Sequence, residues 1–297
     1  MKKTLLVFGV SGFTGTHLGR YLKKNVLEED LYVIGVVSRV QETLFVGIHH
    51  LEVVDALDDF AVLEILRKIR PDYIVNFIGL FRAASYQELI RSNVDISRNI
   101  LQAVVDTSAL ETRLLFIGSA AEYGAVKANP VSEQDFTMPV SLYGLSKVFQ
   151  THLVRFYHQA HRVQSVVART FNLTGEGISA SLSVGNFQIQ IDAVQDGDTI
   201  KVGNLDPERD FLEVETAVEL YMDLLCHGKA GEVYNVCSGK PVRIGDLLAD
   251  MIARSGKTLV LKVSPQLLRG NDISRIYGSR SKLDELLRRI SEGRSHV

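Results

Sequence analysis

The sequence has only two cysteines, almost no net charge and no long hydrophobic run, and each shortage excludes a class of protein. Cys226 and Cys237 show neither a metal-ligand spacing nor a disulfide framework, so we expect free buried thiols in a reducing compartment, the cytoplasm. A formal net charge of −2 argues against nucleic acid or an anionic membrane as the main partner. No apolar run approaches the ~20 residues of a membrane span. The composition therefore predicts a globular protein that binds any anion at a local site.

Motifs of several enzyme classes are also missing. The sequence contains no G-x-S-x-G nucleophile elbow and no GxxxxGK[ST] phosphate loop, which argues against the common serine hydrolases and nucleoside triphosphatases. Its histidines lack the HExxH arrangement and a supporting set of cysteines or carboxylates. We therefore do not expect a metal site.

A glycine-rich turn follows the first predicted strand, residues 4–8, and precedes a predicted helix, residues 16–24. In a dinucleotide site, such glycines allow a tight turn and a close approach of the backbone to the pyrophosphate, whose charge lies at the helix N-terminus. A plain glycine turn is the alternative, but the position after the first strand favours a cofactor loop. The residues that we expect to bind the cofactor here are Gly9, Ser11, Gly12, Phe13, Thr14 and Gly15.

The end of the second predicted strand, residues 31–37, bears on the choice of cofactor. A site for NAD usually presents an acidic residue there to the ribose hydroxyls, whereas this sequence has Ser38 and Arg39. A hydroxyl and a guanidinium suit a 2′-phosphate, so we expect NADP(H) in preference to NAD(H), with a solvated Arg39 as the alternative. Asp55 follows the third strand and is expected either to accept a hydrogen bond from the adenine amine or to cap the helix of residues 58–69.

Strands and helices alternate through most of the chain, which predicts an α/β fold. Apolar runs at residues 73–78, 114–117 and 163–168 are typical of strands buried on both faces of a parallel sheet. We therefore predict a Rossmann-type doubly wound parallel sheet with a smaller α/β C-terminal substrate domain. The expected division places residues 1–171 and 205–240 in the cofactor domain, and residues 172–204 and 241–297 in the smaller domain.

Two tyrosine and lysine pairs, each four residues apart, differ in their context. Tyr123 and Lys127 lie in a segment that contains Gly124, which argues against a helix. Tyr143 and Lys147 begin a segment whose apolar residues recur at helical spacing. One helical turn would place this second pair on one face of a helix, so the second pair is the candidate for catalysis.

The surroundings of the second pair favour chemistry at a carbonyl group. Ser141 precedes it and is a good N-cap residue, which predicts a helix that begins there. The cation of Lys147 is expected to lower the pKa of the Tyr143 phenol and make it a usable proton donor. Ser119 ends the fifth predicted strand and is expected beside the pair, because ligands collect at the carboxyl ends of parallel strands. Alternatively, Ser119 only shapes a turn.

Taken in order, several motifs make the chain similar to a known enzyme family. They are Gly9-x-x-Gly12-x-x-Gly15, Asn93, Ser119, Tyr143-x-x-x-Lys147, Asn172 and Arg209-Asp210-Phe211. As a set they resemble the extended short-chain dehydrogenase/reductases of the nucleotide-sugar type, the NAD-dependent epimerase/dehydratase family. The segments at residues 169–175, 202–205 and 231–239 are similar to those of GDP-4-keto-6-deoxy-D-mannose reductases and their dehydratase relatives.

The resemblance implies a role for each matching residue. Tyr143 would protonate the carbonyl oxygen as hydride arrives from the nicotinamide, Lys147 would hold the ribose hydroxyls, and Ser119 would hydrogen-bond the same oxygen. Tyr143 and Lys147 are therefore both catalytic and cofactor-binding in this interpretation. The residues expected to bind the diphosphate of the sugar nucleotide are Asn172, Arg209 and Arg269.

Two alanines follow Ser119 directly, where related dehydratases carry acidic or hydroxyl residues. The methyl groups of Ala120 and Ala121 cannot move a proton, so we expect NADPH-dependent reduction of the 4-keto group of a nucleotide-linked 4-keto-6-deoxyhexose, GDP-linked by preference. Glu122 stands one residue later and keeps a 4,6-dehydratase open. A 4-epimerase uses the same catalytic groups and stays an alternative, as does a binding protein that senses NADP(H) without catalysis.

The predicted helix that carries Tyr143 has a wide apolar band, which bears on assembly. The band includes Phe149, Phe156, Tyr157 and Ala160 and is wider than one contact with a sheet requires. We therefore expect a homodimer, with a purely intramolecular core as the alternative.

Overall fold

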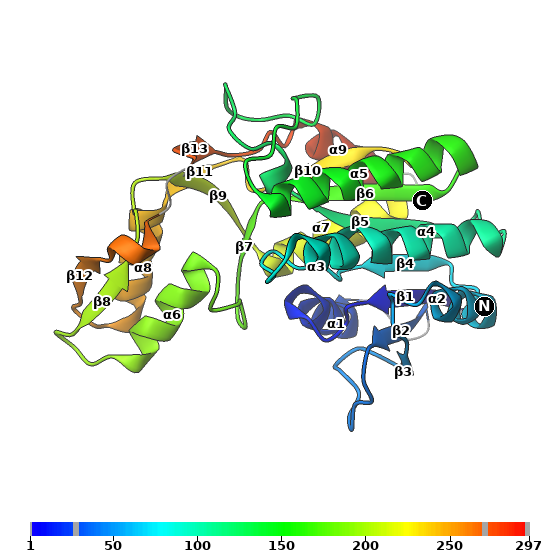
Figure 1. Ribbon diagram of the computed structural model, residues 1–297, viewed down its shortest axis with the longest axis horizontal. Helices are drawn as coiled ribbons and strands as arrows, with labels where there is room; N and C mark the ends of the chain where they lie inside the picture. Colours follow the sequence, from blue (N-terminus) through cyan, green and yellow to red (C-terminus); the bar gives the residue numbers. More distant parts are fainter. Residues whose placement is uncertain (1, 26–29, 269–272, 295–297) are drawn as a thin grey trace.

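Seven parallel strands form the main sheet of the computed structural model, which describes residues 2–25, 30–268 and 273–294 (Figure 1). They are β1 (Lys3–Phe8), β2 (Leu31–Val37), β3 (His50–Val53), β4 (Tyr73–Asn76), β5 (Arg113–Ser119), β6 (Gln164–Thr170) and β10 (Val233–Val236). Their spatial order is β10-β6-β5-β4-β1-β2-β3, and every pair in it is parallel. The order reverses between β1 and β4, where open sheets of this kind bind their ligands beyond the strand ends. The predicted Rossmann-type fold is confirmed.

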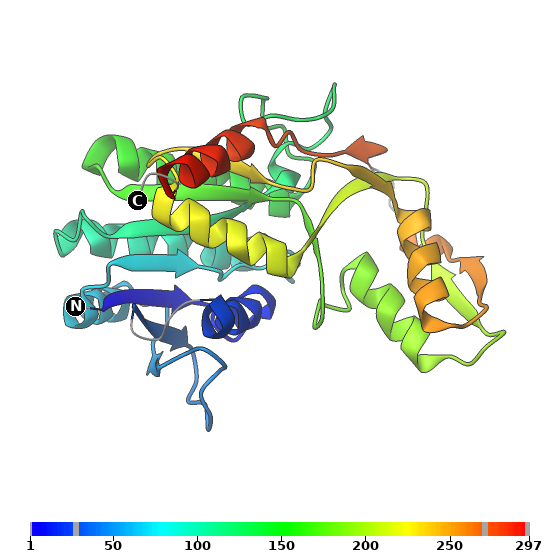
Figure 2. The ribbon, with the colours of Figure 1, turned by 180° about the vertical axis from the view of Figure 1, so that it is seen from behind.

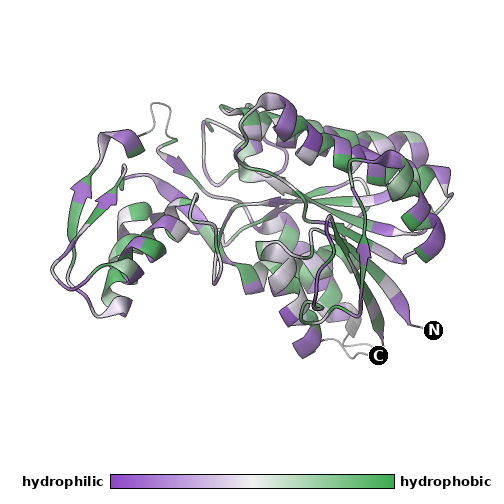
Figure 3. Ribbon diagram, turned by 60° about the horizontal axis from the view of Figure 1, so that its bottom comes forward, coloured by the Kyte–Doolittle hydropathy of each residue, from purple (hydrophilic) through white to green (hydrophobic). Residues whose placement is uncertain are grey.

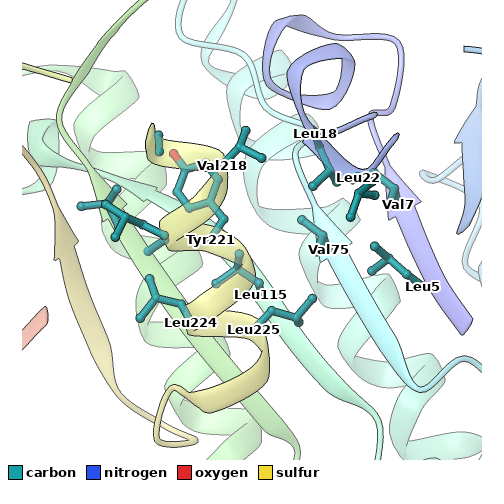
Figure 4. Close-up of a cluster of buried hydrophobic side chains, with 14 of the residues drawn as sticks. Leu5, Val7, Leu18, Leu22, Val75, Leu115, Val218, Tyr221, Leu224 and Leu225 are labelled. Carbon is teal, nitrogen blue, oxygen red and sulfur yellow. The ribbon is translucent and has the colours of Figure 1, made fainter. Parts of the chain in front are cut away.

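Side chains alternate across the strands and bury both faces of the sheet. In β1, Leu5 and Val7 pack on the face covered by α1 (Phe13–Asn25) and α7 (Val214–His227), as Figure 4 shows. Helix α9 (Ser281–Arg294) lies on the same face (Figure 2). Leu6 and Phe8 pack on the other face under α2 (Asp59–Ile69), α4 (Ile96–Asp106) and α5 (Leu142–His161). The strands of the main sheet are mostly hydrophobic in Figure 3, whereas the helices carry both hydrophobic and hydrophilic residues. This two-sided burial explains the apolar runs of the sequence.

A smaller lobe lies beyond one end of the main sheet (Figure 1). It consists of α6 (Ser183–Ala193), β8 (Thr199–Val202), α8 (Ile244–Ser255) and β12 (Val260–Val263). It has a hydrophobic cluster of its own, in which Phe187 and Ile191 of α6 meet Leu248 of α8. The lobe is therefore assembled from two parts of the chain that are far apart in the sequence.

The described residues also form a four-stranded sheet that connects the two lobes. It contains β7 (Asn172–Thr174), β9 (Glu208–Glu213), β11 (Pro241–Arg243) and β13 (Arg275–Ile276). After β9 the chain enters α7, which packs on the main sheet. The predicted domain limits near residues 172, 205 and 241 lie in or beside this connecting sheet, and we keep that division as a proposal.

The helical segment of residues 86–106 is interrupted. A π-helical turn (Arg91–Asp95) separates α3 (Tyr86–Ile90) from α4. Within that turn, the Asn93 side chain accepts a hydrogen bond from Leu80 N (2.8 Å) and donates one to Leu80 O (2.8 Å). The loop after β4 is therefore held against the turn, an interaction that sequence periodicity does not reveal. Such turns are frequent at functional sites.

A buried carboxylate joins three segments at the connecting sheet. Asp210 of β9 is 0% exposed, and its Oδ1 accepts hydrogen bonds from Ser238 N and Ser238 Oγ, both at 2.7 Å. Its Oδ2 accepts hydrogen bonds from Gly239 N (2.9 Å) and Gly278 N (3.2 Å). An ionised carboxylate is suited to this place because all of its partners are donors.

Replacement of this carboxylate should destabilise the fold. In Asp210→Asn, the amide would turn an N–H group towards backbone N–H groups, and we expect the free energy of unfolding to fall by about 3 kcal/mol. Urea denaturation of the variant measures the change. Asp206→Asn is the matched control, because the Asp206 side chain is 87% exposed. Equal urea midpoints for the two variants would contradict the structural role of Asp210.

Candidate active site

The glycine turn after β1 has the geometry that a pyrophosphate requires. Gly9 has φ +80°, and the N–H of Gly12 donates a hydrogen bond to Gly9 O at 3.1 Å. A Cβ on Gly15 would lie 2.4 Å from Gly9 O, so a side chain there is excluded. A Cβ on Gly12 would meet only Gly9 O, at 3.4 Å, which leaves the other side of that backbone open to a ligand. Because α1 begins directly after this turn, the residues present fit a dinucleotide at a helix N-terminus.

Side chains next to the glycine turn are available to a cofactor. Ser11 is exposed, whereas Thr14 and Phe13 are half-buried, and the Phe13 ring packs edge-on against His17 with 5.2 Å between the ring centroids. These residues lie at the junction between the turn and α1.

The other predicted cofactor residues follow β2 and β3, which are neighbouring strands beside β1 in the order β1-β2-β3. Ser38 and Arg39 are exposed directly after β2. Asp55 is exposed and accepts a hydrogen bond from Leu57 N at 2.9 Å, whereas Asp58 is the N-cap of α2. Capping of α2 by Asp55, one of its two predicted roles, is therefore wrong, because Asp58 stands at the helix start.

Ser119 and Tyr143 are brought together by the end of β5 and the first turn of α5. The helix begins as predicted, since Ser141 Oγ accepts a hydrogen bond from Gly144 N at 3.0 Å. The side chain of Ser119 lies close enough to that of Tyr143 to lower the pKa of the phenol. Ser119 Oγ also accepts a hydrogen bond from Ala121 N at 3.2 Å. A hydroxyl and a phenol thus meet beyond the carboxyl end of a central strand, where ligands of such sheets bind.

Lys147 lies one turn later on α5 and is 5% exposed. Its Nζ donates hydrogen bonds to Ile117 O and to Gln150 Oε1, both at 2.9 Å. A Cβ on Gly79 would lie 3.2 Å from this Nζ, so the ammonium lies against the chain that follows β4. An ammonium has three N–H donors, which leaves one for a ligand.

Buried polar side chains surround Lys147 on α4 and α5. Gln150 Nε2 donates to Ser97 Oγ at 2.9 Å, and Ser97 Oγ donates to Asn93 O at 3.1 Å. Asn93 Nδ2 in turn donates to Ser146 Oγ at 2.9 Å. We did not predict roles for Ser97, Ser146 or Gln150, although the spacing of Gln150 from Lys147 places both on one helix face.

The predicted lowering of the Tyr143 pKa by Lys147 is wrong. Burial raises the pKa of Tyr143, the nearby Ser119 side chain partly opposes this, and the negative charge of Glu122 adds to the increase. The ammonium of Lys147 instead bonds to Ile117 O and Gln150, as described above. Tyr143 therefore stays protonated at neutral pH, the state of a proton donor.

Glu122 is not a free acid at this site. It is 0% exposed, and its Oε1 accepts a hydrogen bond from Ser119 N at 2.8 Å. Its Oε2 accepts hydrogen bonds from Thr151 Oγ1 (2.9 Å) and from Arg169 Nε (3.0 Å) and Nη2 (2.8 Å). Four donors therefore occupy the carboxylate.

Two of the predicted substrate residues lie on the connecting sheet. Asn172 of β7 is exposed, and its Nδ2 donates to Asp210 O at 2.9 Å. Arg209 lies on the neighbouring strand β9, and its Nη1 donates to Glu208 O at 2.9 Å. Arg269 lies outside the described residues.

The first tyrosine and lysine pair has no catalytic arrangement, as predicted. Tyr123 is buried, and its hydroxyl donates to Asn235 Oδ1 at 2.7 Å, whereas Lys127 is exposed in a loop. In the described part of the chain, no three histidine, cysteine or acidic side chains gather as metal ligands would. No helix among the described residues has the length and apolar character to cross a bilayer.

Comparison with known proteins shows which family these features represent. The family model of the NAD dependent epimerase/dehydratase family matches residues 5–237. The chain belongs to this family. It is thus an NAD(P)-dependent enzyme of the extended short-chain dehydrogenase/reductase type.

Members of this family with known activities are similar over almost their whole length. GDP-6-deoxy-D-mannose reductase of Pseudomonas aeruginosa is 28% identical over 296 residues, which cover 96% of this chain and 91% of the relative. GDP-6-deoxy-D-talose 4-dehydrogenase of Aggregatibacter actinomycetemcomitans is 26% identical over 285 residues, covering 95% of this chain and 90% of that protein. The solved structure of RMD from Pseudomonas aeruginosa complexed with NADPH has a TM-score of 0.82 at 26% identity, covering 96% of this chain and 92% of that one.

The burial of Lys147 should be visible in its titration. Burial lowers the pKa of Lys147 from 10.5 to about 8, partly opposed by the negative charge of Glu122. Between these pH values the unfolded chain keeps a proton that the folded chain has lost, so this group makes the free energy of unfolding rise with pH there. Competitive labelling with acetic anhydride, read by mass spectrometry, should show a midpoint for Lys147 near pH 8.

The same experiment contains its own control. Lys3 donates a hydrogen bond to Tyr73 OH at 2.9 Å, which raises the pKa of Lys3 above 10.5. Its labelling should therefore require a higher pH than that of Lys147. A Lys147 midpoint no lower than that of Lys3 would contradict the effect of burial.

Proposed function

We propose that this enzyme uses NADPH to reduce the 4-keto group of a nucleotide-linked 4-keto-6-deoxyhexose, GDP-4-keto-6-deoxy-D-mannose by preference. The observation that carries the proposal is the meeting of Ser119, at the end of β5, with Tyr143 in the first turn of α5, one turn before the buried Lys147. The bound nicotinamide would supply a hydride to the carbonyl carbon, and the protein must then supply a proton to the carbonyl oxygen.

Each of the three side chains has a function in this reaction. Tyr143 is protonated at neutral pH and gives its phenolic proton to the carbonyl oxygen. Ser119 Oγ accepts the Ala121 N–H, so its own hydroxyl hydrogen can be donated to the same oxygen. Lys147 has one N–H left for the ribose hydroxyls of the cofactor, and its charge stabilises negative charge on Tyr143 after proton transfer.

Reduction is favoured over elimination of water by the residues that follow Ser119. Ala120 and Ala121 carry no proton-transfer group, and the Glu122 carboxylate is occupied by the buried donors already described. A 4,6-dehydratase would need an acid or base there that is free to act on the sugar. The names of the two relatives, a reductase and a 4-dehydrogenase, agree with carbonyl and alcohol chemistry.

Substrate and assembly are proposed on the same basis. GDP-linked sugars appear in the names of the first two relatives, and Asn172, Arg209 and Arg269 would bind the diphosphate.

A homodimer in the cytoplasm is also proposed. The dimer is proposed because Phe149 and Phe156 of α5 are 41% and 55% exposed and form part of an apolar surface.

The test is the stoichiometry of the cofactor. With GDP-4-keto-6-deoxy-D-mannose, the protein should consume one NADPH for each sugar reduced. The consumption is measured as the loss of NADPH absorbance. Sugar turnover without net loss of NADPH would favour the 4-epimerase, and tight NADPH binding without turnover would favour a sensor.

Tyr143→Phe should lower kcat at least about 100-fold, because the proton donor is lost while the ring remains. Tyr157→Phe is the matched control on the same helix, since the Tyr157 hydroxyl donates a hydrogen bond to Gln102 Oε1 of α4, away from the site.

The choice of cofactor can be tested at the end of β2. Arg39→Asp replaces a charge that suits the 2′-phosphate, so the ratio of kcat/KM for NADPH to that for NADH should fall by about 10-fold to 100-fold. Arg39→Lys keeps the charge and should retain most of the preference. If the ratio does not change in Arg39→Asp, Arg39 is a solvated residue and the preference for NADPH is set elsewhere.

A further inference from the structure

The side chain of Glu122 is hydrogen-bonded to three elements, namely β5, which carries the catalytic serine, α5 and β6. Glu122 ends the 3₁₀ turn (Ala120–Glu122) that follows β5 directly. Its Oε1 holds Ser119 N, and its Oε2 is bonded by Thr151 of α5 and Arg169 of β6. One carboxylate therefore links the strand that carries Ser119 to the helix that carries Tyr143 and to the neighbouring strand.

The contact with α5 lies on the catalytic face of that helix. Thr151 is one turn after Lys147 and two turns after Tyr143. The bond between Thr151 Oγ1 and Glu122 Oε2 measures 2.9 Å and is buried. The position of Ser119 relative to the two other catalytic side chains therefore depends on a hydrogen bond that touches none of them.

The backbone leaves space for this carboxylate. A Cβ on Gly118 would lie 2.7 Å from Glu122 Oε1, so a larger residue there would displace the carboxylate. The guanidinium of Arg169 lies over the Tyr123 ring, 4.6 Å from its centroid, and is 4% exposed. A buried ion pair of this kind is weak evidence for stability, because desolvation offsets most of the attraction. Its geometry points instead to a function in positioning.

We propose that Glu122 is a positioning residue that fixes the catalytic Ser119 against the helix that carries Tyr143 and Lys147. Its charge also sets the electrostatic environment of Tyr143 and Lys147. This inference rests on the proposed function, since it assumes that these three residues carry out the reduction. Glu122 acts through its bonds and its charge, and it does not contact the substrate.

The charge of Glu122 also reaches the titrating groups of the site. It raises the pKa of Lys147 and adds to the raised pKa of Tyr143, in both cases after the effect of burial. Arg169 bonds the Glu122 carboxylate and lies over the ring of Tyr123, whereas Tyr221 interacts with Tyr143. Removal of the Glu122 charge leaves the Arg169 cation uncompensated, so Lys147 should lose its proton at a lower pH.

Two variants separate the charge of Glu122 from its bond to α5. Glu122→Gln removes the charge with little change of shape, and the labelling midpoint of Lys147 should fall below its wild-type value of about 8. Thr151→Val removes only the hydroxyl, so that midpoint should stay, while kcat falls about tenfold because Ser119 is less well placed. Thr151→Ser restores the hydroxyl and should keep kcat within about twofold of wild type.

The outcomes distinguish this inference from the proposed function. Wild-type protein that consumes no NADPH would refute the reductase, whereas the midpoint of Lys147 in Glu122→Gln would still test the effect of the charge. An unchanged midpoint in a folded Glu122→Gln, or wild-type kcat in Thr151→Val, would overturn the positioning role. If Glu122→Gln does not fold, Thr151→Val and Thr151→Ser decide, because both keep the ion pair of Glu122 and Arg169.

Discussion

Burial of both faces of the main sheet is the constraint on which the site depends. In β1 and β5 the side chains alternate between two hydrophobic clusters, so polar groups find room only where the strands end. The glycine turn and Ser38 follow the carboxyl ends of such strands, and Ser119 is the last residue of β5. Because parallel strands end at the same edge, residues far apart in the sequence meet there. The hydrophobic core thus determines the place of the chemistry.

The buried ammonium of Lys147 creates the second requirement. A charge with so little exposure must be hydrogen-bonded, and Ile117 O and Gln150 provide the acceptors. Gln150 is held in turn by Ser97, next to the π-helical turn that contains Asn93. The irregular turn before α4 is therefore part of the support for the buried ammonium of Lys147. A regular helix would not combine the Asn93 contacts to Leu80 with those to α5.

The fold and the meeting of Ser119 with the helix of Tyr143 and Lys147 could be predicted from local patterns. Apolar runs showed the strands, and the N-cap Ser141 with helical periodicity distinguished Tyr143 from Tyr123. Contacts between distant segments could not be predicted in this way. The raised pKa of Tyr143 depends on burial, and the contacts of Glu122 depend on Thr151 and Arg169, which lie 29 and 47 residues away. The N-cap of α2 was also beyond reach, because Asp55 and Asp58 are both acidic and close together. Only the exact start of the helix shows that Asp58 is the cap.

The divided smaller lobe has a consequence for the order of folding during synthesis. Its hydrophobic cluster needs both α6 and α8, so it cannot be completed before residues near 255 have left the ribosome. Strand β6 is likewise an unpaired edge until β10 arrives, more than sixty residues later. The nascent chain therefore holds most of the cofactor-binding sheet before it can form the other lobe. Chaperones that bind exposed strand edges would have their longest opportunity in this interval.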